Sequence, residues 1–252
     1  NRLELFRKKR LTEISKRKGR AVKPSTVNRD VSNLRAMLNK AVEHAKIEVN
    51  PIGRIKLLEE NNVRERVLSQ DEFESLHLHC PPSLKGIVLI GFYLPMRQAE
   101  ILNLTWKEID LKMGFIRLGG ERTKNKIGRN IPLHPRIIEF LRACPRPIDG
   151  GYVFGNSRRF NRKAYNKAVE SAGIADFNFH DLRHCAINNM RLAGNDHFVI
   201  KQASGAKTDS AFQRYNLVTE QEMKSIKWLD EKSGKSGTMD TYMDTSTKTK
   251  IV

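Results

Sequence analysis

The sequence predicts a mainly α-helical protein with one small antiparallel sheet and two folded units. Three observations support this prediction. Apolar residues recur at spacings of three and four over residues 27–41, which is the period of one buried helix face. Two short segments rich in β-formers, residues 115–118 and 129–133, flank a stretch rich in Gly, Lys and Asn, which is typical of a hairpin. A charged stretch at residues 59–66 lacks apolar periodicity and separates the two units.

The composition favours a polyanionic partner. The 252 residues carry a formal net charge of +18 with a pI of about 10.0, which points most simply to nucleic acid. A merely soluble basic protein is the alternative. The three cysteines, Cys80, Cys144 and Cys185, show neither a pairing pattern nor metal-ligand spacing, which fits a reducing compartment. We see no signal peptide and no apolar run long enough to cross a membrane, so no membrane partner is expected.

Residues 1–60 are predicted to form the first unit, and residues 61–68 the linker that follows it. Residues 1–66 contain 18 Lys and Arg against 8 Asp and Glu, a net charge of +10 and more than half of the total. The main helix of this unit has a candidate cap in Ser25 or Thr26. Its predicted buried stripe consists of Val27, Val31, Leu34, Leu38 and Ala41.

The basic side chains of the first unit are candidates for contacts with DNA phosphates. A solvated charged surface is the alternative. The charge is so one-sided that we favour phosphate binding. The candidates are Arg7, Lys8, Lys9, Arg10, Lys16, Arg17, Lys18, Arg29 and Arg35.

The second unit is predicted at residues 69–232 and begins with the capping-box pattern of Ser69 and Glu72. Residues 85–94 are apolar enough for a buried helix, and residues 233–252 have so little to bury that a disordered tail is expected. Further helices are predicted at residues 136–143, 159–172, 187–192, 198–204 and 218–228, and a short strand at residues 152–154. The core candidates are Leu94, Ile101, Leu104 and Trp106.

Residues that carry chemistry gather between His180 and Tyr215. His180 and Arg183 are three residues apart, so on a helix they share one face, and Asp181 suits a helix start. A helix start beside an arginine is a natural place for a phosphate. Taken singly, His180 could be a helix-cap histidine and Tyr215 a buried core tyrosine.

Together with the upstream sequence, these residues resemble the tyrosine recombinases, also called the phage integrase family. The matching patterns are Arg97-x-x-Glu100-Ile-x-x-Leu-x-Trp, Thr-Lys124-x-x-x-x-Arg-x-Ile-Pro-Leu, His180-x-x-Arg183-His184 and Arg-Tyr215. The resemblance covers about residues 25–230. It implies a tyrosine recombinase catalytic fold and a two-domain clamp around DNA. The first unit would be part of the family's helical core-binding domain, and the chain is expected to begin partway through that domain.

The resemblance also implies an active site that cuts and rejoins DNA through a 3′-phosphotyrosyl intermediate. Arg97 and Arg183 would each offer forked donors to the non-bridging oxygens of the pentavalent phosphate. Tyr215 would supply the nucleophilic oxygen, and His180 would assist as hydrogen-bond donor or proton acceptor. Lys124 would protonate the departing 5′-oxygen.

Three further residues complete the candidate site. Glu100 is expected to orient the arginines, and His184 completes the motif that begins at His180. Lys126 is the nearby rival of Lys124 in the hairpin. The scheme requires no cofactor and no metal ion, and the sequence offers no acidic metal cluster.

The implied function is site-specific recombination of double-stranded DNA, in the integration or excision of a mobile element. The resemblance further implies a cytoplasmic protein, at the bacterial nucleoid or phage-encoded. It implies a homotetramer on paired DNA sites in which residues 218–228 dock on a neighbouring copy; packing of Trp228 in its own domain is the alternative. A DNA-binding protein that does not cut, on the same fold, remains an alternative. The type IB topoisomerases share the chemistry, but the short chain and the core-binding helix favour a recombinase.

One position departs from the family pattern. The residue after Gly205 is normally histidine and sometimes tryptophan, whereas here it is Ala206, nine residues before Tyr215. Alanine cannot donate a hydrogen bond to the scissile phosphate, and losing one such donor costs about a hundredfold to a thousandfold in rate. We expect a slow but competent enzyme. A naturally inactive protein, or one altered here to trap a complex, is the alternative.

Overall fold

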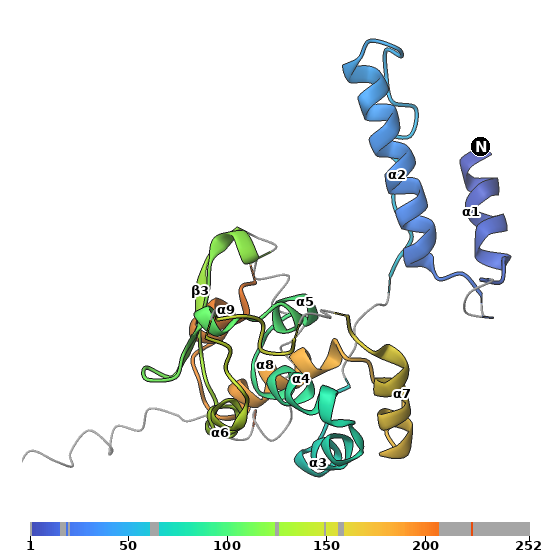
Figure 1. The fold of residues 1–252 in the computed structure, drawn as a ribbon. Coiled ribbons are helices and arrows are strands. Elements are labelled where there is room, and N and C mark those ends of the chain that lie inside the picture. The colour runs from blue at the N-terminus through green and yellow to red at the C-terminus, as the bar shows by residue number, and fades with distance from the viewer. Residues whose placement is uncertain are drawn as a thin grey trace, which may run out of the picture.

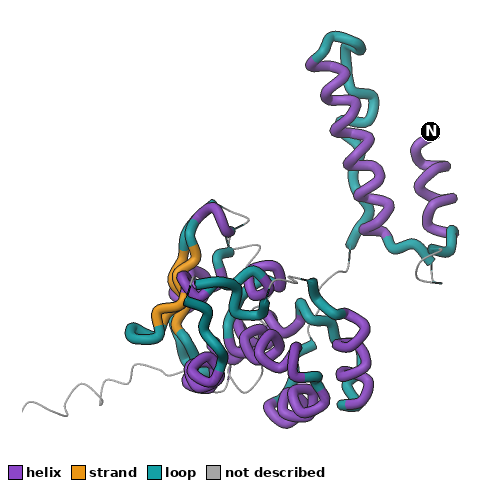
Figure 2. The backbone as a smooth tube through the Cα atoms, in the orientation of Figure 1, coloured by secondary structure: helices purple, strands orange, loops and turns teal. Residues whose placement is uncertain are grey.

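The computed structural model describes residues 2–15, 19, 21–60, 66–123, 126–148, 150–155, 159–206 and 223. Over these residues the protein is mainly helical and has one three-stranded antiparallel sheet (Figures 1 and 2). The predicted fold class, mainly α with a small antiparallel sheet, is therefore confirmed. The three cysteines are free thiols.

The first sixty residues contribute α1 (Arg2–Thr12) and α2 (Pro24–Glu43), which lie beside each other (Figure 1). The sequence did not predict α1, where charged residues outnumber apolar ones. The two helices share a small hydrophobic cluster. Its buried members are Leu3, Val31 and Ile52, and Leu38 and Ile55 pack against it.

Two predictions for α2 are wrong. The helix begins at Pro24, and neither Ser25 nor Thr26 caps it. Proline suits the first helical position because its fixed φ is already helical and an amide there has no partner to lose. Val27 is buried as predicted, but Leu34 on the same face remains 40% exposed. Burial requires a covering partner as well as the right period.

The capping box predicted at Ser69 and Glu72 is confirmed. Ser69 Oγ accepts a hydrogen bond from the Glu72 amide at 3.1 Å, and Glu72 Oε2 accepts one from the Ser69 amide at 2.9 Å. This capping box opens α3 (Gln70–His79). The next helix, α4 (Pro82–Tyr93), is buried on nearly all sides and contacts α3, α5, α6 and α8. Gly86 permits this packing, since a Cβ there would lie 2.1 Å from Phe140 Cζ.

The sheet consists of β1 (Ile109–Asp110), β2 (Phe115–Leu118) and β3 (Arg129–Pro132), in that order. The predicted β2–β3 hairpin is confirmed, whereas β1 was not predicted. Two 3₁₀ turns, Trp106–Glu108 and Gly120–Arg122, lie beside the strands.

The predicted strand at residues 152–154 is wrong. Tyr152 makes a single isolated bridge with Thr105, in which Val153 N donates to the Leu104 carbonyl at 2.9 Å and Trp106 N donates to the Gly151 carbonyl at 3.1 Å. Two backbone contacts hold this segment against the core, but they do not extend into a ladder.

The remaining helices are α5 (Gln98–Leu102), α6 (Pro135–Ala143), α7 (Arg162–Ser171), α8 (Asp181–Leu192) and α9 (His197–Ser204). The predicted helices in these regions are confirmed, with shifted ends. For example, α7 begins at Arg162 because Asn161 Oδ1 caps it, accepting from the Ala164 amide at 3.0 Å. The core candidates Leu94, Ile101, Leu104 and Trp106 are all buried. The predicted helix at residues 218–228, apart from Met223, and the tail lie outside the described residues.

Candidate active site

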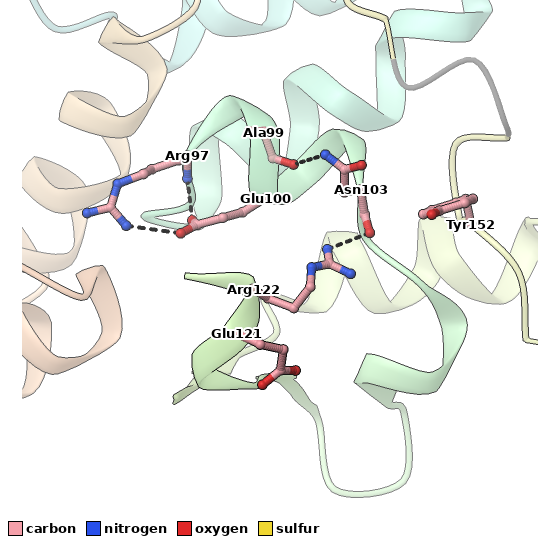
Figure 3. A pocket seen from close by; sticks show the side chains of 7 residues that line it. All are labelled: Arg97, Ala99, Glu100, Asn103, Glu121, Arg122 and Tyr152. Atoms are coloured by element: carbon pink, nitrogen blue, oxygen red, sulfur yellow. Dashed lines mark hydrogen bonds and ion pairs between the residues drawn. The ribbon is translucent and has the colours of Figure 1, made fainter. Parts of the chain in front are cut away.

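Arg97 stands at the N-terminus of α5. Its backbone amide donates to Glu100 Oε2 at 2.7 Å, and its Nη1 donates to Glu100 Oε1 at 3.0 Å (Figure 3). The Arg-x-x-Glu pattern folds this way because a glutamate at the third helical position reaches back to the amide of the cap residue. The Arg97 side chain is 26% exposed and that of Glu100 is 4% exposed. The guanidinium therefore lies at the edge of the site with the carboxylate beneath it.

Glu100 also holds an arginine of the sheet. Arg129, the first residue of β3, donates from Nη2 to Glu100 Oε2 at 2.7 Å and from Nη1 to Glu100 Oε1 at 3.2 Å. The Arg129 side chain is 5% exposed. Burial raises the pKa of Glu100, but the hydrogen bonds and charge of Arg129, followed by the backbone and side-chain hydrogen bonds of Arg97, outweigh it and hold that pKa below its usual value. The carboxylate stays ionised between two guanidiniums.

Arg183 is buried in the first turn of α8. Its Nη1 donates to the carbonyl of Pro95, and its Nη2 donates to the carbonyl of Ser204 at 2.8 Å. Pro95 lies two residues before Arg97, so the contact ties the two predicted catalytic arginines together. Ser204 ends α9, where carbonyl groups lack helical partners and carry partial negative charge, which suits a buried cation.

His180 immediately precedes α8, and His184 follows one turn later. Their rings lie 5.8 Å apart and nearly perpendicular. Desolvation lowers the pKa of His180, and the charges of Arg183 and Arg97 lower it further, while Asp181 raises it. Although desolvation affects its pKa, the residue His180 is exposed to solvent, so a ligand can reach the imidazole. A neutral imidazole at this position can accept a proton.

The turn after α9 contains the position that departs from the family pattern. Gly205 has a φ of +66°, and a Cβ there would lie 3.0 Å from Arg129 Nη1. The left-handed backbone conformation favours glycine, and a Cβ would crowd the Arg129 guanidinium. The amide of Ala206 donates to Ser204 Oγ at 3.2 Å, and its side chain packs against the cluster of Ile187 and Ile200.

A pocket of about 480 Å³ lies beside Arg97 (Figure 3). Arg122 contributes a further guanidinium, whose Nη2 donates to the Asn103 carbonyl at 2.5 Å. Its Nη1 lies 3.3 Å from Glu108 Oε1. Tyr152 also lines this pocket.

Lys124 and Tyr215 lie outside the described residues, so their placement stays a prediction. The base of the loop that carries Lys124 is described. Thr123 Oγ1 donates to the Ile127 carbonyl at 2.9 Å and accepts from the Ile127 amide at 3.1 Å. These bonds fasten the two ends of the loop together. Lys126, the predicted rival, is exposed and has a φ of +56°.

The structure divides the basic candidates of the first unit into two groups. Lys8, Lys9 and Arg29 are exposed, while residues 16–18 lie outside the described residues. Three arginines make internal contacts. Arg7 donates to Glu4, Arg10 to Glu13 and Asp30, and Arg35 to the Ile55 carbonyl.

Sequence reasoning gave Arg129 no role in the site, although it is the arginine of the Thr-Lys-x-x-x-x-Arg pattern. A signal was present, because strand residues alternate between two faces and Arg129 shares the inward register of Ile131. A buried charged residue needs a partner of opposite charge. The sequence does not reveal that the partner is Glu100.

Among the described residues, no group of three or more His, Cys, Asp or Glu side chains is arranged to hold a metal ion. The helices in that part of the chain are all too short or too polar to cross a membrane.

Comparisons with known proteins give the chain its family. A family model described as the phage integrase family matches residues 66–222. The shufflon-specific DNA recombinase of Escherichia coli is 31% identical over 215 residues, which cover 83% of this chain and 55% of that protein. The integrase of Salmonella phage P22 is 27% identical, covering 73% and 52%. The chain thus spans about half the length of these relatives.

The fold agrees with this match. The solved structure of the Tn1549 transposon integrase, in complex with a circular intermediate DNA, aligns with a TM-score of 0.62 at 17% identity. The alignment covers 81% of this chain and 79% of that one. The protein has the tyrosine recombinase fold, and the chain belongs to the phage integrase family.

Proposed function

We propose that the protein is a site-specific DNA recombinase that cuts and rejoins double-stranded DNA through a 3′-phosphotyrosyl intermediate. The observation that carries this proposal is the linkage of Arg97 and Arg183, which come from separate helices and meet through the Pro95 carbonyl. Membership of the phage integrase family supports it. The names of the phage and transposon relatives favour integration or excision of a mobile element as the setting.

The arginines act on the phosphate. Among the described residues, Glu100 is the side-chain partner of Arg97, and it engages one end of the guanidinium. The outer edge of the guanidinium can therefore donate to non-bridging phosphate oxygens. Arg183 adds a second fixed positive charge beneath. Donors that are already in place stabilise the charge that develops on the pentavalent phosphate without reorganisation.

Strand cleavage then transfers one bond and one proton. The Tyr215 hydroxyl oxygen attacks phosphorus, a phosphotyrosyl bond forms and the bond from phosphorus to the 5′-oxygen breaks. The tyrosine proton passes to the neutral imidazole of His180, and Lys124 donates a proton to the 5′-oxygen. Rejoining is the reverse reaction, so the bond energy is conserved and neither ATP nor a metal ion is needed.

The binding of DNA is divided between two units in this proposal. Residues 1–60 form the first domain and residues 69–232 the catalytic domain, with residues 61–68 as linker and 233–252 as tail. The separate hydrophobic cluster of α1 and α2 supports the division. Exposed Lys8, Lys9 and Arg29 supply positive charge for phosphates.

Assembly as a homotetramer on two DNA sites completes the proposal. A groove of about 1050 Å³ runs between the sheet and helices α8 and α9. Leu192, Phe198 and Val199 expose apolar surface on it. We assign this groove to residues 218–228 of a neighbouring copy. Deleting residues 218–252 should weaken synapsis of two sites more than binding to one site in a gel-shift assay, and unchanged synapsis would rule the assignment out.

A DNA-binding protein that does not cut is the second candidate. The observation that favours it is Ala206, which offers no side-chain donor where the family has one. The two candidates differ in whether a covalent protein–DNA adduct forms.

The test is to incubate the protein with nicked attachment-site DNA and to look for a covalent adduct on a denaturing gel. Tyr215→Phe should abolish the adduct and leave the Kd for DNA unchanged, because only the nucleophilic oxygen is lost. Tyr152→Phe is the matched control, since this tyrosine lines the pocket beside Arg97. An adduct that persists in Tyr215→Phe would assign the nucleophile to another residue. The absence of any adduct with the unaltered protein would favour the second candidate.

A further inference from the structure

The hydrogen bonds around Glu100 close into a ring, and one of the three arginines in this ring lies outside the proposed catalytic set. The ring joins α5, β3, α9 and α8, which are far apart in the sequence. Arg97 donates to Glu100, which also accepts from Arg129, and Arg129 donates to the Ala203 carbonyl. The next carbonyl along the backbone, that of Ser204, accepts from Arg183, which also donates to the Pro95 carbonyl. The backbone from Pro95 through Met96 to Arg97 closes the ring.

Arg129 makes the widest set of connections in this ring. Each of its three nitrogens donates a hydrogen bond: Nη1 and Nη2 to Glu100, and Nε to the Ala203 carbonyl at 2.9 Å. Its guanidinium also lies against Gly205, where a Cβ would stand 3.0 Å from Nη1. Arg129 therefore fixes the carboxylate under Arg97 and the end of α9 at the same time.

We propose that Arg129 is a positioning residue for strand cleavage: it holds Arg97 through Glu100, and it holds the turn after α9 from which the chain continues to Tyr215. This inference rests on the proposed function. Without Arg129, the buried carboxylate of Glu100 would keep Arg97 as its remaining partner among the described residues. An unpaired buried charge is unfavourable, so Glu100 would draw the guanidinium of Arg97 inward, away from the phosphate.

The β2–β3 hairpin is connected to this ring, because Arg129 is the first residue of β3. Arg129 follows Lys124 by five residues, at the point where the loop rejoins the sheet. On the strand that follows the hairpin loop, the Arg129 side chain thus contacts both the carboxylate under Arg97 and the end of α9. Lysine cannot replace it, because an ammonium is a point charge and does not supply the rigid fork that reaches the carboxylate and the carbonyl together.

The test compares Arg129→Lys and Arg129→Met with the unaltered protein in single-turnover cleavage of nicked DNA, at saturating protein. We expect both variants to cleave about a hundredfold more slowly, since a misplacement of about 1 Å costs that much. The Kd for DNA should stay unchanged, because Arg129 is buried. A lower cleavage rate at saturating protein, with an unchanged Kd for DNA, is the result expected of a positioning residue.

The matched control is Arg136→Met. Arg136 makes a two-pronged pair with Glu74, between α6 and α3, and takes no part in the ring. Its removal should lower the melting temperature without slowing saturated cleavage. If Arg129→Met does not fold, Arg129→Lys decides, because it keeps the charge and loses the fork.

Three results would overturn the inference. The first is an unchanged cleavage rate in both Arg129 variants. The second is a loss of cleavage that disappears at saturating protein, because the defect would then lie in DNA binding. The third is an equal slowing of cleavage in Arg136→Met. An unaltered protein that forms no adduct overturns the proposed function, and the inference with it. That failure is distinguishable because it appears in the unaltered protein before any variant is compared.

Discussion

Arginines are used in different ways in the first sixty residues and in the active site. On α1, Arg10 pairs with Glu13, and the two side chains are 31% and 43% exposed. Exposed pairs of this kind contribute about 0–1 kcal/mol to stability. In the site, Arg129 and Glu100 are both buried, and breaking a buried pair by removing one partner costs about 3–5 kcal/mol.

The hydrophobic core of the first sixty residues is also smaller than that of the second unit. The cluster shared by α1 and α2 has three buried residues, and Leu5, Phe6 and Met37 of these helices remain exposed. The core of the second unit surrounds α4 on nearly all sides and reaches Leu182 of α8, in the turn that carries Arg183. Lys8, Lys9 and Arg29 of the first unit are exposed, whereas Arg129 of the site is buried against Glu100 and holds internal geometry.

The largest expected effect tests the geometry of the site. Ala206→His should speed single-turnover cleavage of nicked DNA about a hundredfold, because it adds a donor beside the scissile phosphate. The turn that presents this position is already held by Arg129 and by the αL conformation of Gly205. Ala206→Phe is the control, since it adds a ring without a donor and should leave the rate low. Equal rates for Ala206→His and the unaltered protein would show that position 206 contributes nothing to the transition state.

Local sequence signals predicted most of what lies close together along the chain. The Ser69 capping box, the bond between Arg97 and Glu100 and the helix start at His180 all depend on residues within four positions of one another. Each is an instance of short-range helix geometry.

The rest depended on distant contacts. Arg129 meets Glu100 across 29 residues and Ala203 across 74, and no periodicity encodes such a meeting. The exposure of Leu34 likewise depends on what covers α2 rather than on its own helix. Sequence reasoning therefore pointed to Arg97 and Arg183, whose catalytic roles stay predictions, and it gave no role to Arg129, which pairs with Glu100.

A smaller effect tests the first unit. Changing both Lys8 and Lys9 to Gln should weaken DNA binding and reduce the slope of log K against log salt by about 2, because each phosphate contact contributes about 0.9. Cleavage at saturating protein should not change. Arg10→Gln is the matched control, since Arg10 already pairs with Glu13 and Asp30. A flat salt titration of the unaltered protein would leave the net charge of +18 without a role.

The smallest effect concerns the pH dependence of cleavage. The neutral imidazole of His180 accepts the tyrosine proton in the proposed mechanism, so the rate should fall as pH drops through the pKa of His180. Desolvation, followed by the charges of Arg183 and Arg97, lowers that pKa from 6.5. The acid side of the pH profile should therefore lie below pH 6.5. A midpoint above 6.5, in single-turnover rates measured at saturating protein, would contradict this assignment.

The variant Asp181→Asn tests the assignment to His180 a second time, through the direction of the pKa shift. The carboxylate of Asp181 raises the pKa of His180 and so opposes the two arginines. Removing its charge should move the acid side of the profile to still lower pH, when each profile is normalised to its own plateau. The amide keeps an oxygen for the Asn178 backbone N–H, which donates to Asp181 Oδ2 at 2.8 Å. A shift to higher pH would show that His180 is not the titrating group, because no loss of negative charge can raise the pKa of an imidazole beside it.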